Sequence, residues 1–205
     1  NAVLASRLPQ SVPAVTIDRQ CGSSQQAVQF AAQAVMSGTQ DIVIAAGGES
    51  MTRVPMGSNY ALYQQAGVGV GPFSKRTQDR FGVPMFSQFQ GAEMIARKYG
   101  FSRDVLDQFA LESHQKAAAA IAAGAFANEI VPLAVDGSTH TIDEGVRMDA
   151  TLEGIGSVKL LAEGGVISAA NASQMCDGAS GVLIVSERAL KQFGLTPMAR
   201  IHTMT

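Results

Sequence analysis

The 205-residue sequence has no tryptophan, only two cysteines and only three histidines, and these scarcities exclude several classes of protein. Cys21 and Cys176 cannot form the disulfide framework that holds many small secreted domains together. Cysteine and histidine also never recur at the short spacings that bind zinc, so we expect no metal site. Both thiols are therefore expected to be free, and the cytoplasm is the expected compartment.

Charged residues and long apolar runs are scarce as well. The net charge is −2, which gives the chain no global electrostatic attraction to nucleic acid or to an anionic membrane surface. No apolar run is long enough to span a bilayer. The opening residues, NAVLASRLPQ, lack the basic leader and apolar block of a signal peptide. With 46% hydrophobic residues, the chain can bury one sizeable core or two small ones. We expect neither nucleic-acid partners nor membrane insertion.

The first 50 residues alternate between strand-like and helix-like patterns. A β-branched run at 12–18 is expected to form a buried strand, and 41–50 (DIVIAAGGES) a second one. Between them, residues 22–38 place apolar side chains at helical spacing and stop at Ser37-Gly38. Strand, helix and strand in this order predict a parallel sheet covered by helices.

The rest of the chain is expected to be mainly helical before it returns to the strand–helix pattern. Residues 51–90 have the composition of a long loop. Two helices should follow, over 91–100 and 103–124, and we expect their inward faces to carry Ala92, Ile95, Ala96 and Tyr99 in the first and Val105, Leu106, Phe109 and Ala110 in the second. Residues 127–137 are strand-like, and 181–194 predict a core strand and a helix that ends at glycine.

Cys21 has the most suggestive position among the polar side chains. It follows the first expected strand and opens a helix through Gly22, Ser23 and Ser24. Unpaired N–H groups and the positive end of a helix dipole stabilise an anion there, which favours a nucleophilic thiolate. The same N–H groups can face a thioester oxyanion. Position alone leaves a second interpretation equally open, in which Cys21 is a buried and inert thiol.

The wording around Cys21 resembles one family closely. VTIDRQCGSSQQAVQFAAQAVMSG at 15–38 is similar to the nucleophile segment of the thiolases, the acetyl-CoA acyltransferases, and GGESM at 47–51 to the loop that follows it. Further along, GAEMIARKYGFSRDVLDQFALESHQKAAAA resembles the helices of the family's insertion domain. DATLEG and ISAANASQMCDGAS resemble the segments that close that domain. The resemblance covers nearly the whole chain in order, but only the middle of the family's sequence.

The resemblance implies a role for several residues. Cys21 would be the nucleophile that takes an acyl group from acyl-CoA as a thioester. Coenzyme A would be contacted by a small-residue loop, here Ala169, Ser173 and Met175. Ser87 and Gln88 would also bind the substrate; they stand where the biosynthetic branch commonly has His and Met. The wording DRQCGSS is closer to the degradative branch. The implied reaction is thiolysis of 3-oxoacyl-CoA or the reverse Claisen condensation in fatty acid metabolism, with no cofactor beyond the coenzyme A thioester.

Some motifs of the family are absent from the sequence. These are the GHP histidine that activates the nucleophile, the Asn-Glu-Ala-Phe segment and the segment that carries the family's second catalytic cysteine in a CxG motif. Cys176 has the same C-x-G spacing in QMCDG, but this loop resembles the segment that closes the insertion domain. The three histidines, His114, His140 and His202, are expected to be exposed or hydrogen-bonded. Cys176 is expected to be a structural cysteine without a catalytic role. Because loss of a general base typically costs about 10²–10⁴-fold in rate, the 205 residues by themselves are expected to be poorly active.

The expected fold is α/β: the thiolase fold, with an N-terminal half-domain layer of parallel or mixed sheet and helices, and a helical insertion. Residues 1–52 would belong to the half-domain, 53–172 to the insertion that binds coenzyme A, and 173–205 would return to the half-domain and start the C-terminal half. A homodimer or homotetramer is implied. The alternatives are a decarboxylating ketoacyl synthase of the same superfamily and a catalytically silent thiolase-like protein that serves assembly or binding.

Overall fold

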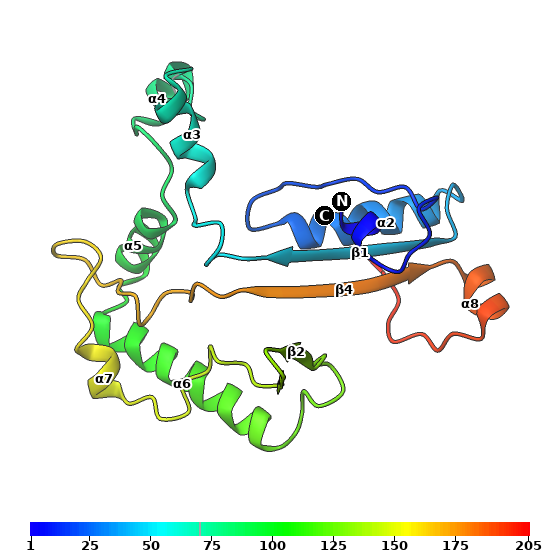
Figure 1. Cartoon of the computed structure of the whole chain (residues 1–205). Coiled ribbons are helices and arrows are strands. Elements are labelled where there is room, and N and C mark those ends of the chain that lie inside the picture. Colours follow the sequence, from blue (N-terminus) through cyan, green and yellow to red (C-terminus); the bar gives the residue numbers. More distant parts are fainter. Residues whose placement is uncertain (70) are drawn as a thin grey trace. The chain divides into compact units, whose positions relative to one another are not determined.

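Two units make up the chain in a computed structural model that describes residues 1–69 and 71–205 (Figure 1). Unit 1 comprises Asn1–Ser50 and Asp177–Thr205, and unit 2 comprises Met51–Cys176. The boundaries expected from the sequence, after residues 52 and 172, lie close to the unit boundaries after Ser50 and Cys176. Val70, in the segment expected to be a long loop, lies outside the described residues.

An antiparallel ribbon of two strands, with a helix packed on it, forms unit 1. The strands β1 (Ile42–Glu49) and β4 (Gly178–Val185) pair from Ile42 opposite Val185 to Glu49 opposite Gly178. Helix α2 (Ser23–Met36) packs along both strands (Figure 1). The short helices α1 (Ala2–Ala5) and α8 (Glu187–Phe193) complete the unit. Helices and strands are thus mixed in one layered unit, and the predicted α/β class is confirmed.

Alanines form the core of unit 1. The buried apolar side chains here are Ala31 and Ala32 of α2, Ala45 of β1 and Ala189 of α8. Methyl side chains let the helix backbone come close to the strands, because no larger group holds the two layers apart. The first turn of α2 is thereby fixed against β1 and β4.

Three expectations for this unit are wrong. Residues 12–18 form no strand: Pro13 lacks the N–H that a ladder needs, and Val15 is exposed. The sheet pairing among the described residues is antiparallel, because β1 pairs with the distant β4 rather than with 12–18. The strand expected to be core is half exposed, with Val182 and Leu183 near 50% accessible. The helices over α2 and α8 are confirmed, and α8 ends at the left-handed Gly194 as predicted.

Unit 2 is largely helical. Its longer helices are α5 (Gln88–Tyr99) and α6 (Arg103–Ala122), and α7 (Leu152–Gly156) packs against α6 (Figure 1). The strands β2 (Leu133–Val135) and β3 (Ser138–His140) pair as a short antiparallel hairpin. The strand-like pattern at 127–137 is confirmed only over β2. Within the described residues, no helix combines the length and the apolarity that crossing a membrane requires.

Residues 51–90 are not the continuous loop that their composition predicts. They contain α3 (Ser58–Ala66) and α4 (Lys75–Phe81). The Ser74 hydroxyl accepts from the N–H of Thr77 at the start of α4, and Gly82 ends that helix in a left-handed conformation. The capping signals at these two positions outweigh the loop-like composition.

The predicted inward faces of α5 and α6 are largely wrong. Ala96 is buried as expected, but Ile95, Tyr99, Val105 and Phe109 are exposed. The buried residues of these helices include two carboxylic acids, Glu93 and Asp107. Apolar periodicity cannot find such a face, because the side chains that turn inward are charged and hydrogen-bonded.

A polar cluster fastens the open end of the β1–β4 ribbon. Asp41 directly precedes β1. Its carboxylate accepts a hydrogen bond from the Ser186 hydroxyl, at 2.7 Å, and forms an ion pair with Arg188. Ser186 in turn caps α8 by accepting from the N–H of Ala189. The hydrogen bond from Arg188, followed by that from Ser186, lowers the pKa of Asp41 below its ordinary value of 3.8.

Replacement of Asp41 by Asn should lower the free energy of unfolding near neutral pH. The difference from the wild type should shrink as the pH falls through the lowered pKa of Asp41, because a carboxyl with a lower pKa in the folded state stabilises the fold only above that range. Denaturant titrations over a pH series measure it. Asp79→Asn, in the exposed pair with Lys75, is the control and should have little effect. A difference that does not shrink as the pH falls from near neutral through the lowered pKa would contradict the assignment.

Candidate functional site

Cys21 lies at the start of α2 with its backbone in the left-handed region. Its φ angle is 61°, and Asp136 is the other described residue besides glycine with a positive φ. Helix α2 begins two residues later, at Ser23, with Gly22 as its N-cap residue. For an L-residue this conformation costs about 1–2 kcal/mol, and such costs are typically found at functional sites.

The turn that carries Cys21 is held by hydrogen bonds around Arg19. The Gly22 N–H donates to the Arg19 carbonyl at 2.7 Å. The Ser23 hydroxyl accepts from the Arg19 N–H at 2.9 Å and donates to the Arg19 carbonyl at 3.1 Å. These bonds place Cys21 in a turn position that chains usually give to glycine. The side chain is solvent-exposed, and the thiol is free.

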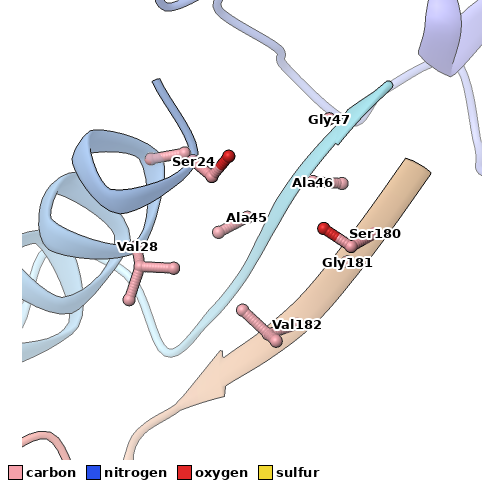
Figure 2. Close-up of a pocket in the computed structure, with 9 residues that line it drawn as sticks. Ser24, Val28, Ala45, Ala46, Gly47, Ser180, Gly181 and Val182 are labelled. Carbon is pink, nitrogen blue, oxygen red and sulfur yellow. The ribbon is translucent and has the colours of Figure 1, made fainter. Parts of the chain in front are cut away.

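A small open cleft lies beside the first turn of α2 (Figure 2). Its volume is about 80 Å³. Figure 2 shows Ser24 and Val28 of α2 facing Ala45 of β1 across it. The walls are small or apolar side chains: Ser24, Ala27, Val28, Ala45, Ala46, Gly47, Ser180, Gly181 and Val182. The alanine-based packing of unit 1 therefore leaves a narrow apolar space next to the helix end that follows Cys21.

The residues predicted to contact coenzyme A belong to unit 2. Ala169, Ser173 and Met175 lie on one exposed loop, with Met175 74% accessible. Ser87 is the N-cap residue of α5, where its hydroxyl accepts from the Gln90 N–H, and Gln88 is the first residue of the helix. Cys21 belongs to unit 1. The coenzyme A roles of these five unit 2 residues stay predictions.

Glu93 of α5 reaches the start of this loop. Its side chain is only 5% exposed, and Oε1 accepts the backbone N–H groups of Val166 and Ile167, each at 2.9 Å. Gly165 lies so close that an added Cβ would come within 2.3 Å of Oε1. The carboxylate and the glycine together set the path by which the chain enters the loop.

Asp107 of α6 holds the same loop through Asn171. Asp107 is 2% exposed; its Oδ1 accepts from Asn171 Nδ2 at 2.9 Å, and its Oδ2 from Arg103 Nε at 2.6 Å. Asn171 also donates to the Val166 carbonyl and accepts from the Ser168 N–H, at 3.0 and 2.8 Å. Arg103 reaches beyond this set and donates to the carbonyls of Ile155 and Val158.

Sequence reasoning missed Glu93, Asp107 and Asn171. A weak signal existed for Glu93, which is flanked by Ala92 and Ala96 on the expected inward face of its helix. Asp107 and Asn171 have no such signal, because 64 residues separate them and only the fold brings them together. His114 was expected to be exposed or hydrogen-bonded, and its Nδ1 indeed accepts from the Arg147 N–H at 3.2 Å. In the described part of the chain, no three His, Cys, Asp or Glu side chains gather in a way that could hold a metal ion.

Replacement of Gly165 by Ala should destabilise unit 2 by about 1–3 kcal/mol, because the new methyl group must displace the Glu93 carboxylate from the Val166 and Ile167 N–H groups. Denaturant unfolding measures the change. Gly91→Ala is the matched control: it lies on α5 with nothing within 4 Å, and should stabilise by roughly 0.5–1 kcal/mol. Equal effects of the two substitutions would show that the carboxylate does not occupy this position.

Comparisons with known proteins agree on one family. Residues 1–188 match the family model described as thiolase, N-terminal domain. A steroid 3-ketoacyl-CoA thiolase of Mycobacterium tuberculosis is 47% identical over 201 residues, which are 97% of this chain and 49% of that protein. A 3-ketoacyl-CoA thiolase of Cronobacter sakazakii is 38% identical over 100% of this chain and 52% of its own length.

A solved structure gives the same result in three dimensions. The crystal structure of human mitochondrial 3-ketoacyl-CoA thiolase in complex with CoA superposes with a TM-score of 0.76 at 31% identity, over 95% of this chain and 50% of that one. The chain thus spans about half the length of the curated relatives that it matches. Fold and sequence together show that the chain belongs to the thiolase family and carries that family's N-terminal domain.

Proposed function

We propose that the protein is an acetyl-CoA C-acyltransferase of the thiolase type, in which Cys21 accepts the acyl group. The observation that carries the proposal is the exposed thiol of Cys21, held in a left-handed conformation at the start of α2. A chain under no functional constraint would avoid this cost by placing glycine there. The names of the relatives, which are 3-ketoacyl-CoA thiolases, support the same chemistry.

In the thiolytic direction, the Cys21 thiolate attacks the 3-oxo carbonyl carbon of the substrate. The bond between C2 and C3 then breaks, and the two-carbon part takes up a proton and leaves as acetyl-CoA. The shortened acyl group remains on Sγ as a thioester. The thiol of a second coenzyme A attacks this thioester, loses its proton, and releases the shortened acyl-CoA together with the Cys21 thiolate. Claisen condensation is the reverse sequence.

The start of α2 favours the anionic intermediate of this reaction. The first N–H groups of a helix have no partner within the helix, and its dipole places partial positive charge at this end. We propose that these charges stabilise the thioester oxyanion and that the Cys21 N–H donates to it.

We propose that coenzyme A binds the exposed loop of unit 2 through Ala169, Ser173 and Met175. Support comes from the human relative, whose structure is a complex with CoA. Ser87 and Gln88 at the start of α5 are proposed to contact the substrate as well, and their departure from the His-Met pair favours an acyl preference other than that of the biosynthetic branch. The wording DRQCGSS supports a degradative type. The substrate is proposed to be a 3-oxoacyl-CoA whose acyl chain is of fatty acid or steroid origin.

Further properties of the whole protein are proposals of the same kind. We propose that it acts in fatty acid metabolism in the cytoplasm, as a homodimer or homotetramer. It is proposed to need no cofactor beyond the coenzyme A thioester, since the thiol carries the acyl group itself.

Cys21→Gly should abolish acylation without loss of stability. In the wild-type chain, incubation with acetyl-CoA should add one acyl group to the intact mass, and the glycine variant should add none. Its free energy of unfolding should stay equal or rise by about 1 kcal/mol, because glycine adopts the left-handed conformation without strain. Asp136→Gly, at the other left-handed position, tests the stability effect away from the thiol.

Cys176→Ser is the control for the acylation itself. Cys176 is also exposed and free, so it reports the labelling that any accessible thiol would receive. This variant should keep the acyl adduct. An adduct that disappears with Cys176, or that survives Cys21→Gly, would remove Cys21 from the mechanism. A folded full-length protein that forms no adduct would favour the silent alternative.

Ser173→Trp should weaken coenzyme A binding at least about tenfold, because the indole would fill the space proposed for the ligand beside an exposed loop. Calorimetric titration of the 205-residue chain with coenzyme A measures the dissociation constant. Ser113→Trp would disturb α6 itself, so the control is Ser138→Trp on the exposed hairpin. Unchanged affinity of Ser173→Trp would place coenzyme A elsewhere.

A further inference from the structure

Two buried carboxylates converge on one exposed loop of unit 2. Glu93 comes from α5 and Asp107 from α6, and both are at least nine-tenths buried. Between them lies the segment 165–171, which forms the first part of the loop and includes Ala169. Ser173 and Met175 follow it in the same loop. Burial of a carboxylate is costly unless its oxygens are hydrogen-bonded, so two such groups at one loop call for a physical reason.

Three consecutive N–H groups of the loop donate to side chains of this set. Glu93 accepts from the N–H groups of Val166 and Ile167, and Asn171 accepts from the N–H of Ser168. Ladder pairing comes from a short bridge between Leu160 and Ser168, where the Leu161 N–H donates to the Ile167 carbonyl at 2.9 Å. Consecutive N–H groups in a loop would otherwise be bonded to water, and the loop would sample many conformations.

Asn171 connects the loop to Asp107. Its amide group donates to Asp107 Oδ1 and to the Val166 carbonyl, so one side chain joins the helix to both ends of the segment. The second oxygen of Asp107 is paired with Arg103, which neutralises the buried charge. Hydrogen bonds to charged groups are about twice as strong as neutral ones, which makes this connection stiff.

We infer that Glu93 and Asp107, joined to the loop by Asn171, are positioning residues that hold segment 165–171 in the conformation that binds coenzyme A. This inference rests on the proposed function of the loop. The three side chains, called the loop clamp, do not touch the ligand themselves. They remove in advance the entropy that the loop would lose on binding, so the clamp acts on affinity rather than on the chemical step.

Asn171→Asp separates positioning from simple packing. The substitution keeps the shape of the side chain but replaces the donor amide by a carboxylate that faces Asp107. Near neutral pH the dissociation constant for coenzyme A should rise at least about tenfold, because two like charges meet and a buried acceptor loses its donor. At lower pH the two carboxyls can share a proton, and the ratio of variant to wild-type dissociation constants should fall toward one.

Calorimetric titration of the 205-residue chain with coenzyme A, between about pH 5 and 8, gives this ratio, and hydrogen exchange reports the N–H groups of 166–168. Faster exchange together with a pH-dependent loss of affinity supports the clamp. Faster exchange at unchanged affinity would overturn it and leave the proposed function intact. So would a loss of affinity that is the same at every pH without faster exchange, which would mean direct contact of Asn171 with the ligand. A wild-type chain that does not bind coenzyme A would overturn both proposals.

Glu93 offers an independent pair of variants should Asn171→Asp fail to fold. Glu93→Gln keeps an oxygen that can accept from Val166 and Ile167, so affinity should stay within about threefold of wild type, whereas Glu93→Ala should weaken binding by about tenfold or more. Glu112→Ala, on the exposed face of α6, is the matched control and should have no effect. Equal affinity of Glu93→Gln and Glu93→Ala would overturn the inference.

Discussion

The left-handed turn at Cys21 is the constraint on which the functional account depends. Hydrogen bonds from Gly22 and Ser23 to Arg19 fix the turn, and the alanine core beneath α2 fixes the helix that follows. The backbone strain at Cys21 is therefore balanced by local hydrogen bonds and by packing, both independent of the thiol. This separation leaves the side chain free to serve chemistry rather than stability.

In unit 2, buried carboxylates hold a loop in place. The loop proposed to bind coenzyme A is exposed and still has a defined conformation, and an apolar core can do little for a loop whose contacts are mostly made by backbone N–H groups. Glu93 and Asn171 supply acceptors for those groups, and Arg103 offsets the charge of Asp107. A buried ion pair adds little stability by itself, so its value here lies in fixing one conformation.

The sequence allowed the α/β class, α2, α8 and the position of Cys21 just before a helix to be predicted, because helical periodicity and capping residues act locally. It could not reveal that β1 pairs antiparallel with β4, since 128 residues and more separate the partners and pairing is a non-local choice. The inward faces of α5 and α6 were missed because Glu93 and Asp107 are charged. The candidate site was predicted through a family resemblance, whereas the residues that support its loop become visible only in three dimensions.

The most direct test is the relative acylation rate of the two free thiols in one molecule. The 205-residue chain is treated with acetyl-CoA, native or in denaturant, and the label on Cys21 and on Cys176 is quantified by peptide mass spectrometry. If the folded turn activates Cys21, it should react faster than Cys176 in the native chain, and the preference should vanish on unfolding. Equal rates in the native chain, or a preference for Cys21 that persists in denaturant, would contradict the account.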